Sequence, residues 1–593
     1  MNILGVSCYY HDSAAALLQD GMVTAAAEEE RFSRIKHDSG FPERAIDFCL
    51  RTGGIQSKDL DYVVFYEKPL VKLERILTTA VENFPRSSGA FRDAMATWLG
   101  DKLWLKSRFV EKLRVPREKV LFVDHHAAHA ASSFFCSPFK EAAILTVDGV
   151  GEWTTAAMGT AQADWDGTGT NAIRLLKEIR FPHSLGLLYS AFTAFLGFEV
   201  NEGEYKVMGM APYGNPEYLD KVYRLIRVCD DGSFELDMDY FSFQYSTNRT
   251  FSDKFVRLFG EPRDRKSEFI TSLTNPDVSP KSPQVAKNQY YADVAASIQR
   301  ATEDIILRMA NHLHRKTQLK TLCMAGGVAL NSVANGRILR ETPFESLFIQ
   351  PAAGDSGGAL GAALYAWHVL LRKPRKFVLE NAYLGRAYDD IEIRAFLGER
   401  SISYQVCADD DALCSTVTNE LTSGKVVGWF QGRFEWGPRA LGNRSILADP
   451  RHAKMKEIVN SKIKFREPFR PFAPVILEQE AEQYFEGLSN PSGCYPARYM
   501  LLVLPWNNGH GELAPAVNHM GTGRLQTIRP EWNPRYHRLV EQFGRATGVP
   551  VLMNTSFNLR GEPIATSPAD ALSTFTRSDI DVLVLDRFII RKE

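Results

Sequence analysis

The chain has 593 residues, of which 45% are apolar and 24% are charged, and its formal net charge is -1. This is too long for one hydrophobic core, so we expect two or three domains, and the near-zero charge excludes a global field that would attract nucleic acid or an acidic membrane. The eight cysteines form no CxxC pair, which argues against a zinc ribbon or a disulfide framework. No apolar stretch reaches the ~18 residues of a membrane helix and no leader segment is recognisable, so we predict a cytoplasmic protein.

The first elements form a repeated pattern. Residues 3–32 predict a strand, a turn around His11, a second strand, a turn at Asp20 and a third strand, followed by a helix that ends at a glycine pair. The pattern returns from Ala142 as an apolar strand, an acidic glycine turn and a second strand. Two such meanders, each followed by helices, predict a duplicated α/β unit with ligands in the cleft between its halves.

The next segments predict an excursion, a long helix and a linker. Residues 242–290 are polar and rich in Ser, Pro and charge, which we interpret as a long surface excursion, either a lid or a passive insertion. Residues 290–316 predict a helix. A basic run from Arg372 marks a linker, so the expected domains are 1–372 and 373–593. The predicted apolar face of the helix consists of Val294, Ile298, Ala301, Ile305, Met309 and Leu313.

Three histidines lie within five positions on one predicted helix. His125 and His129 are four residues apart and share a helical face, whereas His126 points elsewhere, and Asp124 suits the N-cap. A histidine pair at this spacing is an efficient metal clamp, with ordinary polar packing as the alternative.

Two aspartates could complete such a site. Asp148 follows an apolar strand, and Asp355 stands in a glycine turn that leads into a helix of small residues. Two imidazoles and two carboxylates suit a divalent transition metal with open coordination positions. The alternative for each aspartate is a turn-forming or helix-capping role.

Other single positions are candidates for ligand contacts. Gly326 and Gly327, directly after a predicted strand, would let the backbone approach a phosphate or a nucleoside, although a tight turn explains them equally well. His11 is a candidate general base and Lys36 a candidate anion contact. Satisfied surface groups are the alternative for both.

The second half of the chain carries basic residues in glycine-rich and aromatic strings. In a nearly neutral chain, such residues are expected to face an anion, and because acidic helices separate them, a compact ligand such as ATP fits better than nucleic acid. The basic residues are Arg433, Arg439, Arg444, Arg451, Lys462, Lys464, Arg466, Arg470, Arg524, Arg529 and Arg560, and the polar Asn554, Ser556 and Asn558 accompany the last of them.

The motifs together resemble one family over nearly the whole chain, the NodU/CmcH O-carbamoyltransferases, which include tobramycin-, cephamycin- and saxitoxin-type enzymes. The motifs that carry this resemblance are YYHDSAAAL at Tyr9, EEERFSRIKHD at Glu28, HHAAHAASSFF at His125, TVDGVGEW at Thr146, GEYKVMGMAPYG at Gly203, GDSGGALGAAL at Gly354, GRFEWGPRALGNRS at Gly432 and MNTSFNLRGEPI at Met553.

The resemblance implies a fold and a reaction. It implies a duplicated actin-like (ASKHA, RNase H-like) N-terminal domain and a YrdC-like C-terminal α/β domain. It implies that the C-terminal domain makes carbamoyl-adenylate from carbamoyl phosphate and ATP, with Mg²⁺ accompanying ATP, and that the other domain passes the carbamoyl group to a hydroxyl of a small natural product. The expected protein is a monomer or homodimer with no nucleic-acid or membrane partner.

The resemblance also implies residue roles. It implies Fe²⁺, or another divalent metal, on His125, His129, Asp148 and Asp355, with His11 as the base and Lys36 as a carbamoyl-adenylate contact. No comparable motif marks the acceptor pocket. Two other functions stay open, threonylcarbamoyl transfer to tRNA and nucleotide sensing without transfer. The implied adenylation pocket, of which Arg439 and Lys464 would be catalytic, consists of Arg439, Lys464, Arg470, Arg524, Asn554 and Ser556.

Overall fold

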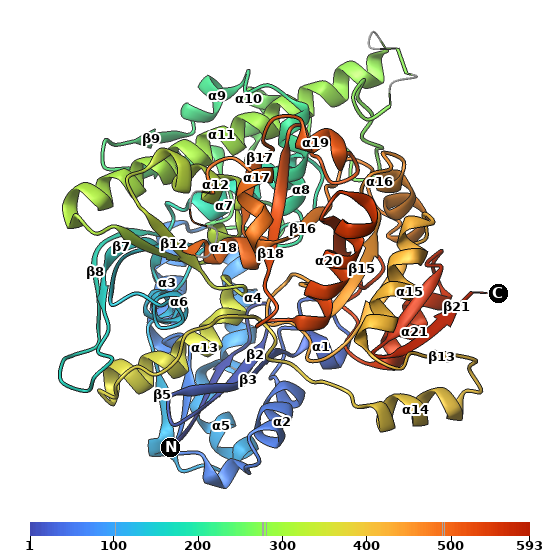
Figure 1. The fold of residues 1–593 in the computed structure, drawn as a ribbon. Coiled ribbons are helices and arrows are strands. Elements are labelled where there is room, and N and C mark those ends of the chain that lie inside the picture. The colour runs from blue at the N-terminus through green and yellow to red at the C-terminus, as the bar shows by residue number, and fades with distance from the viewer. Residues whose placement is uncertain (101, 276–277, 280–281, 489, 491–492, 593) are drawn as a thin grey trace. The chain divides into compact units, whose positions relative to one another are not determined.

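The computed structural model describes residues 1–100, 102–275, 278–279, 282–488, 490 and 493–592. The chain forms two compact units (Figure 1). The first consists of Met1–Tyr9, Ala15–Thr24 and Leu50–Val378, and the second of Tyr10–Ala14, Ala25–Cys49 and Leu379–Glu593. The second unit therefore includes two segments from the N-terminal part of the chain. The domain boundary at residue 372 remains a prediction.

The first unit is built on two five-stranded sheets with the same strand order, although Ala14 of β2 and the last four residues of β3 belong to the second unit. One sheet runs β3 (Met22–Glu28), β2 (Ala14–Gln19), β1 (Asn2–Ser7), β4 (Tyr62–Phe65) and β5 (Val120–Phe122). The other runs β8 (Ala172–Arg180), β7 (Thr154–Gln162), β6 (Glu141–Val147), β11 (Thr321–Ala325) and β12 (Ser346–Ile349). In chain order both follow 3-2-1-4-5, and in each sheet the fourth strand pairs in parallel with the first and the fifth strand with the fourth. The predicted duplicated α/β unit of the actin-like type is confirmed.

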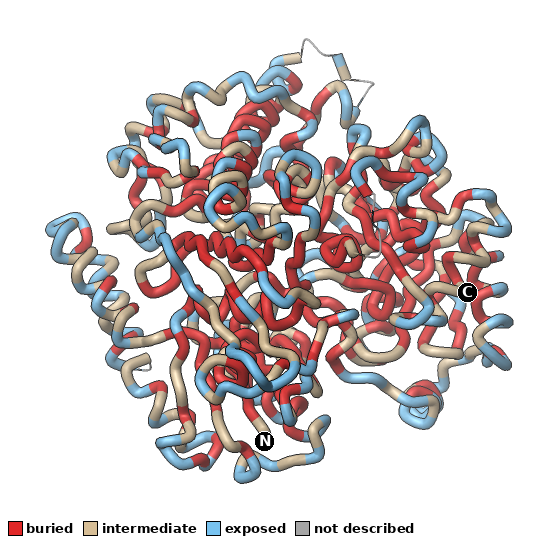
Figure 2. The backbone as a smooth tube through the Cα atoms, turned by 60° about the vertical axis from the view of Figure 1, so that its left-hand side comes forward, coloured by how far each residue is buried: buried red, intermediate tan, exposed pale blue. Residues whose placement is uncertain are grey.

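Helices connect and cover these sheets, and most of the strands are buried, as strands covered by helices are expected to be. Strands β1, β4, β6 and β11 are mostly buried, whereas β8 is largely exposed. Figure 2 shows buried stretches of the backbone in the interior and exposed stretches at the periphery. A small two-stranded sheet pairs β9 (Ile226–Val228) with β10 (Phe234–Leu236). The helices of this unit are α3 (Pro69–Glu82), α4 (Ser88–Gly100), α5 (Leu105–Leu113), α6 (His125–Phe134), α7 (Leu185–Phe195), α8 (Glu204–Met210), α9 (Leu219–Tyr223), α10 (Asp253–Phe259), α11 (Pro283–Thr317), α12 (Ser332–Glu341) and α13 (Asp355–Tyr365).

The long helix α11 confirms the predicted apolar face. It begins earlier than predicted, because the Ser282 hydroxyl accepts the Val285 N–H and Pro283 stands in the first turn. The six predicted core residues are 0–3% exposed. The period-3.6 pattern was sufficient here, since the helix packs one continuous face inward.

The interpretation of residues 242–290 as a surface excursion is wrong for several of their phenylalanines. Phe251, Phe255 and Phe259 are buried, and Phe255 lies 5.1 Å from the Phe192 ring of α7. The polar composition hid this, because a few phenylalanines at helical spacing are enough to anchor a segment on the core. The part of the segment at 276–277 and 280–281 lies outside the described residues.

The second unit is built on one mixed sheet of nine strands. Its order is β13 (Gln405–Val406), β21 (Phe588–Arg591), β20 (Val582–Leu585), β14 (Val427–Phe430), β15 (Arg444–Ala448), β19 (Val551–Ser556), β16 (Ala473–Leu477), β18 (Thr522–Ile528) and β17 (Leu502–Pro505). Among its described strands, β14–β20 and β16–β18 pair in parallel and the other neighbouring pairs are antiparallel. The helices are α1 (Glu30–Ser33), α2 (Glu43–Thr52), whose last residues belong to the first unit, α14 (Asp390–Glu399), α15 (Asp410–Thr422), α16 (Met455–Ile458), α17 (Ala481–Tyr484), α18 (Tyr495–Arg498), α19 (His510–Leu513), α20 (Pro534–Thr547) and α21 (Pro568–Thr576).

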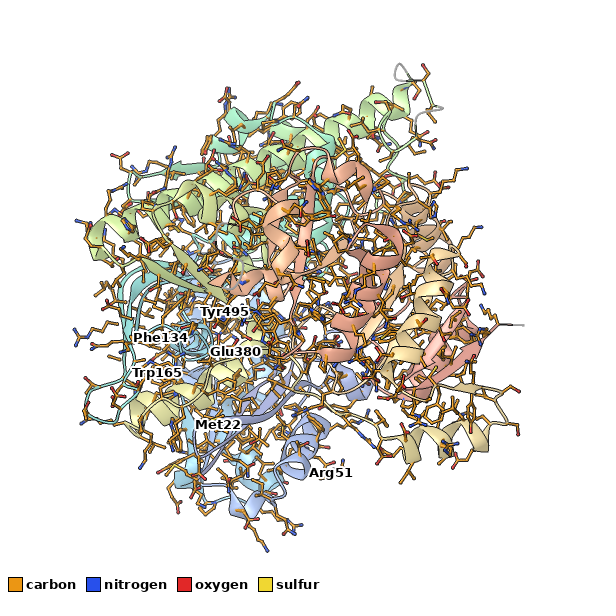
Figure 3. The ribbon with its side chains drawn as sticks, in the orientation of Figure 1. Met22, Arg51, Phe134, Trp165, Glu380 and Tyr495 are labelled. Atoms are coloured by element: carbon orange, nitrogen blue, oxygen red, sulfur yellow. The ribbon has the colours of Figure 1, made fainter. Side chains whose placement is uncertain are left out.

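Local signals define several helix ends of this unit. Helix α21 starts at a capping box in which the Ser567 side chain accepts the Asp570 N–H, and α20 ends at Gly548 in the left-handed region. The hydrophobic core of the second unit contains the fully buried Trp429. Figure 3 shows Tyr495 beside Glu380, and the Tyr495 hydroxyl lies 3.2 Å from Glu380 Oε1.

Aromatic rings of the first unit surround a buried arginine. Arg375 lies 4.4 Å from the centre of the Trp165 ring and 5.4 Å from that of Phe134, both labelled in Figure 3. Its Nη1 donates to the Phe139 carbonyl oxygen. The basic run that we interpreted as a linker therefore also contributes a buried side chain.

Over the described residues, no helix combines the length and the apolar character that crossing a bilayer demands.

We expect the stability of the fold to decrease below about pH 6.5, in part through His368. Its ring is buried and stacks on Phe135, with 4.3 Å between the ring centres, and burial lowers the pKa of His368 from 6.5 to about 3. The unfolded chain takes up this proton near pH 6.5 and the folded chain does not, so the free energy of unfolding falls by up to about 1.4 kcal/mol for each pH unit towards pH 3.

Thermal unfolding midpoints measured from about pH 7.5 to about pH 5 check this expectation. His368→Phe, which keeps a ring against Phe135 but does not titrate, should flatten the profile. His452→Gln, at an exposed position, is the matched control and should leave the profile unchanged. Equal profiles for His368→Phe and the unaltered chain would contradict the assignment.

Candidate active site

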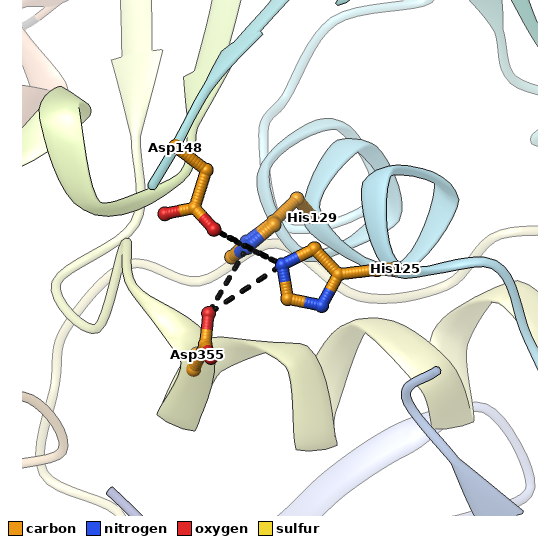
Figure 4. A group of neighbouring side chains, drawn as sticks. All are labelled: His125, His129, Asp148 and Asp355. Atoms are coloured by element: carbon orange, nitrogen blue, oxygen red, sulfur yellow. Dashed lines mark hydrogen bonds and ion pairs between the residues drawn. The ribbon is translucent and has the colours of Figure 1, made fainter. Parts of the chain in front are cut away.

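Four ionisable side chains meet in the interior of the first unit (Figure 4). His125 and His129 come from α6, Asp148 follows β6, and Asp355 opens α13. The two Nε2 atoms are 3.0 Å apart, Asp148 Oδ2 lies 3.1 Å from His125 Nε2, and Asp355 Oδ1 lies 3.4 Å from His129 Nε2. All four residues are at most 6% exposed. The structure thus brings together every residue of the predicted metal set.

Small residues allow α13 to approach α6 closely enough for these contacts. A Cβ on Gly361 would collide with the Ala128 carbonyl oxygen of α6, and a Cβ on Gly5 of β1 would collide with the Ala359 carbonyl oxygen of α13. A side chain at either position would push the helix away. The small residues of the sequence GDSGGALGAAL are therefore needed for close helix packing, and this packing places Asp355 beside the two histidines.

Asp124 stands at the N-cap position of α6, as predicted, but its side chain makes no capping hydrogen bond, and Glu152 holds the helix N-terminus instead. Asp124 lies 2.9 Å from Lys68 Nζ. The buried Glu152 carboxylate accepts the N–H of His125 at 3.0 Å and that of Lys68 at 2.8 Å. Glu152 lies four residues after Asp148, so one loop supplies both a cluster residue and the group that orients the histidine helix. In the sequence, only the position of Glu152 near the end of the DGVGEW motif pointed to this role.

Neighbouring groups orient the carboxylates. Asp148 Oδ1 accepts the N–H of Gly327 at 2.7 Å, which leaves Oδ2 for the histidines, and the Tyr66 hydroxyl lies 3.5 Å from Asp355 Oδ2. Gly326 has a positive φ of 96°. The predicted glycine pair thus shapes the turn that holds Asp148, while its nucleotide contact remains a prediction.

The cluster fits a divalent metal ion. Ligand atoms that each lie about 2.1 Å from one ion are separated by about 3.0–3.4 Å, close to the separations between its Nε2 and carboxylate oxygen atoms. A Cβ on Gly151 would lie 2.8 Å from the His125 ring, so the ring is confined in this orientation. Nδ1 of neither histidine has a hydrogen-bond partner among the described residues. Two nitrogen and two oxygen donors with no thiolate match the preferences of Fe²⁺, Mn²⁺, Co²⁺ or Zn²⁺.

The electrostatics show how strongly the site favours a positive charge. Burial by itself lowers the pKa of His129, but hydrogen bonds to Asp148 and Asp355 and the charges of these carboxylates outweigh it and raise the pKa to about 9. His126 differs, because burial and the neighbouring histidines lower its pKa to about 3. Its two nitrogens lie 2.7 Å from Thr146 Oγ1 and 2.8 Å from the Thr154 carbonyl oxygen, so it is a neutral packing residue.

A second charged site lies in the second unit around Lys464. This lysine follows the π-helix η8 (Val459–Ile463) and is 3% exposed. Its Nζ donates to the carbonyl oxygens of Ser556 and Asn558, at 2.7 Å and 2.8 Å, and to both side chains. Burial, followed by the charges of Arg466, Arg470 and Lys36, lowers the pKa of Lys464. Lys36, which is distant in the sequence, therefore contributes to the electrostatic environment of Lys464.

The other predicted pocket residues are placed within the same unit. Arg439 and Arg470 are both half-buried, and Arg470 Nη1 lies 3.4 Å from Glu467 Oε2. Asn554 is 1% exposed, and its Nδ2 donates to Gln526 Oε1 at 2.7 Å and to the Ala440 carbonyl oxygen at 3.2 Å. Arg524 stands on β18 opposite Val503 of β17. Their contacts with a nucleotide remain predictions.

His11 is part of a histidine–aspartate–histidine arrangement in the second unit. Asp12 Oδ2 lies 2.9 Å from His11 Nδ1, and Asp12 Oδ1 lies 2.6 Å from His37 Nδ1. The Glu30 side chain accepts the N–H of His37 at 3.0 Å. Asp12 and His37 were not singled out from the sequence. A carboxylate that accepts from Nδ1 fixes the tautomer in which Nε2 carries the lone pair, which is the usual arrangement of a histidine base.

The described structure is that of an α/β protein with two candidate sites, a buried group of four potential metal ligands in a duplicated α/β unit and the buried Lys464 with its partners in a mixed α/β unit. The family model "Carbamoyltransferase N-terminus" matches residues 2–364, and the model "Carbamoyltransferase C-terminus" matches residues 418–592. The chain belongs to the carbamoyltransferase family, and the expected resemblance is confirmed.

Curated relatives agree with this assignment. The chain is 46% identical to the uncharacterized protein sll1178 of Synechocystis sp., over 100% of this chain and 97% of that protein. It is 36% identical to nodulation protein NolNO of Sinorhizobium fredii, over 98% of this chain and 79% of that protein. It is 34% identical to 3'-hydroxymethylcephem-O-carbamoyltransferase of Amycolatopsis lactamdurans, over 46% of this chain and 49% of that protein.

Proposed function

We propose that this carbamoyltransferase is an O-carbamoyltransferase that works in two stages, first forming carbamoyl-adenylate from carbamoyl phosphate and ATP and then carbamoylating a hydroxyl of a small molecule. The observation that carries the proposal is that one chain matches both family segments and holds a separate charged site in each. The metal-ligand cluster falls within residues 2–364, and Lys464 with its partners falls within residues 418–592.

The site around Lys464 suits the first stage. Adenylyl transfer requires cations that neutralise the triphosphate and the departing pyrophosphate, and it needs few covalent steps from the protein. Lys464 and Arg439 would contact the phosphates as catalytic residues, with Mg²⁺ accompanying ATP. Arg470, Arg524, Asn554 and Ser556 would complete the pocket, and Lys36 would contact the carbamoyl-adenylate.

The cluster in the first unit suits the second stage. His125, His129, Asp148 and Asp355 would hold the ion, for which the resemblance implies Fe²⁺, and a bound divalent ion supplies polarisation of a carbonyl or binding of a phosphate. His11 would take the proton of the acceptor hydroxyl on Nε2, because Asp12 occupies Nδ1. A positioned base of this kind contributes about 10²–10⁴-fold to a rate.

The acceptor is proposed to be a hydroxylated small molecule. One relative is named as an O-carbamoyltransferase of a hydroxymethylcephem, and others are nodulation proteins. Threonylcarbamoyl transfer to tRNA is not favoured, because both family models that match are carbamoyltransferase models. A nucleotide sensor without transfer chemistry is likewise not favoured.

The experiment combines a coupled assay with mass spectrometry. We expect pyrophosphate release from ATP that depends on carbamoyl phosphate, and the gain of one carbamoyl group by a member of a panel of hydroxylated metabolites. ATP binding without carbamoyl phosphate-dependent pyrophosphate release would instead support the sensor. Carbamoylation of no hydroxyl compound, with modification of tRNA, would support the other alternative.

A further inference from the structure

The loop that carries Arg439 is held at its C-terminal side by one buried carboxylate. Oε1 of Glu435 accepts three backbone N–H groups, those of Leu441 at 2.7 Å, Asn443 at 2.8 Å and Arg444 at 3.2 Å. Glu435 is 2% exposed. Gly442 has a φ of 107°, and a Cβ there would collide with the Tyr536 ring, so the loop needs glycine to fold around the carboxylate. Charge-assisted hydrogen bonds of this kind are stronger than neutral ones.

The other side of the loop is held by an ion pair from the N-terminal part of the chain. Oε1 of Glu28 accepts the N–H of Gly437 at 2.7 Å, and Nη2 of Arg31 donates to the Gly437 carbonyl oxygen at 2.5 Å. Arg31 Nε lies 3.3 Å from Glu28 Oε2, and both side chains are buried. One ion pair therefore fixes both peptide groups of Gly437, two positions before Arg439. Glu28 and Arg31 belong to the segment Ala25–Cys49 of the second unit.

Neutral groups hold the carbonyl oxygens between these two points. Asn554 donates to the Ala440 carbonyl oxygen, and Gln526 and Tyr383 each donate to that of Leu441 at 2.9 Å. Pro438, whose ring restricts its own φ, is the exposed residue of the loop. The backbone on both sides of Arg439 is thus fixed by buried hydrogen bonds.

From this geometry we infer that Glu28, Arg31 and Glu435 are positioning residues that place Arg439 for adenylyl transfer, and that the segment Ala25–Cys49 is a working part of the adenylate-forming site. The inference rests on the proposed function. Its physical reason is that a cation stabilises a developing phosphate charge only if its position is set before the reaction, since reorganisation during the step costs rate. Lys36, a predicted ligand contact, belongs to the same segment.

A double-mutant cycle in the full-length enzyme tests the inference. Glu28→Gln is expected to lower kcat for carbamoyl phosphate-dependent pyrophosphate release by about tenfold or more, with a smaller change in the KM for ATP. In an Arg439→Ala background, the same substitution should have almost no further effect, because residues that act through one another are not additive. Glu435→Gln should behave in the same way.

A matched control separates positioning from loss of stability. Glu303 is a similarly buried carboxylate of the first unit that pairs with Arg337 at 2.9 Å, so Glu303→Gln should lower the unfolding midpoint without changing kcat. Additive effects of Glu28→Gln and Arg439→Ala would overturn the inference, as would equal kcat values for Glu28→Gln, Glu435→Gln and Glu303→Gln. The absence of pyrophosphate release in the unaltered enzyme would instead overturn the proposed function, so the two failures are distinguishable.

Discussion

His129→Ala should abolish carbamoyl transfer to the acceptor while leaving carbamoyl phosphate-dependent pyrophosphate release almost intact. The reason is that His129 Nε2 lies within 3.7 Å of three other ligand atoms of the cluster, whereas the cations proposed to bind ATP belong to the other family segment. Removing one of four ligands typically costs metal affinity by orders of magnitude, and the two remaining carboxylates would then lie close together in a buried site with less compensation.

The measurements are metal content per chain after dialysis and the rates of the two stages. We expect a loss of bound metal and a transfer rate lower by about 10³-fold or more. The matched control is His126→Gln, since His126 stands in the same helix, is equally buried, and makes its contacts with Thr146 and Thr154 instead. Retention of metal and of transfer in His129→Ala would show that the cluster is only a packed polar group.

The second large effect is expected for Lys464→Met, which should lower pyrophosphate release by about 10²–10³-fold. Lys464 is the buried cation whose ammonium is surrounded by four oxygen atoms of Ser556 and Asn558, so its position is set before ATP arrives. A methionine of similar length keeps the packing and removes the charge. Because those oxygens then lack their donor, some stability will be lost as well.

Transfer activity and a neighbouring lysine provide the controls for this substitution. If chemically prepared carbamoyl-adenylate is supplied, Lys464→Met should still carbamoylate the acceptor, because the metal-ligand cluster is unchanged. Lys462→Met, two residues earlier at an exposed position, should leave both rates near those of the unaltered enzyme. Equal losses in both stages for Lys464→Met would indicate general damage to the fold and would contradict the assignment.

In the candidate metal site, the sequence pattern predicted the positions of residues that are close together in the chain. The spacing of His125 and His129 placed both on one helical face, and the strand before Asp148 placed that carboxylate at a strand end, as the structure confirms. Short-range geometry of this type depends only on helical and strand periods. The glycine-rich and aromatic motifs around Arg439 and Lys464 indicated an anion-binding site. They did not indicate which residues hold each side chain in place.

The sequence-based predictions failed where a contact was made by a residue far away in the chain and not by the neighbouring residue that local preference suggested. Asp124 had the sequence preference of an N-cap, but Glu152 reaches the helix N-terminus and Asp124 pairs with Lys68. The polar composition of residues 242–290 concealed phenylalanines that pack beside α7. In both places tertiary contacts outweighed local propensity.

By itself, the sequence determined the duplicated strand pattern, the long helix and its inward face, and the identity of the four possible metal ligands, because each follows from local periodicity or from a distinctive string. Only the tertiary structure decided that Asp355 meets His129, that Glu152 orients the histidine helix, and that Glu28 and Arg31 fix the loop of Arg439. These contacts join residues far apart in the chain, and they form because burial of charged groups is tolerated only where their partners are brought within hydrogen-bonding distance.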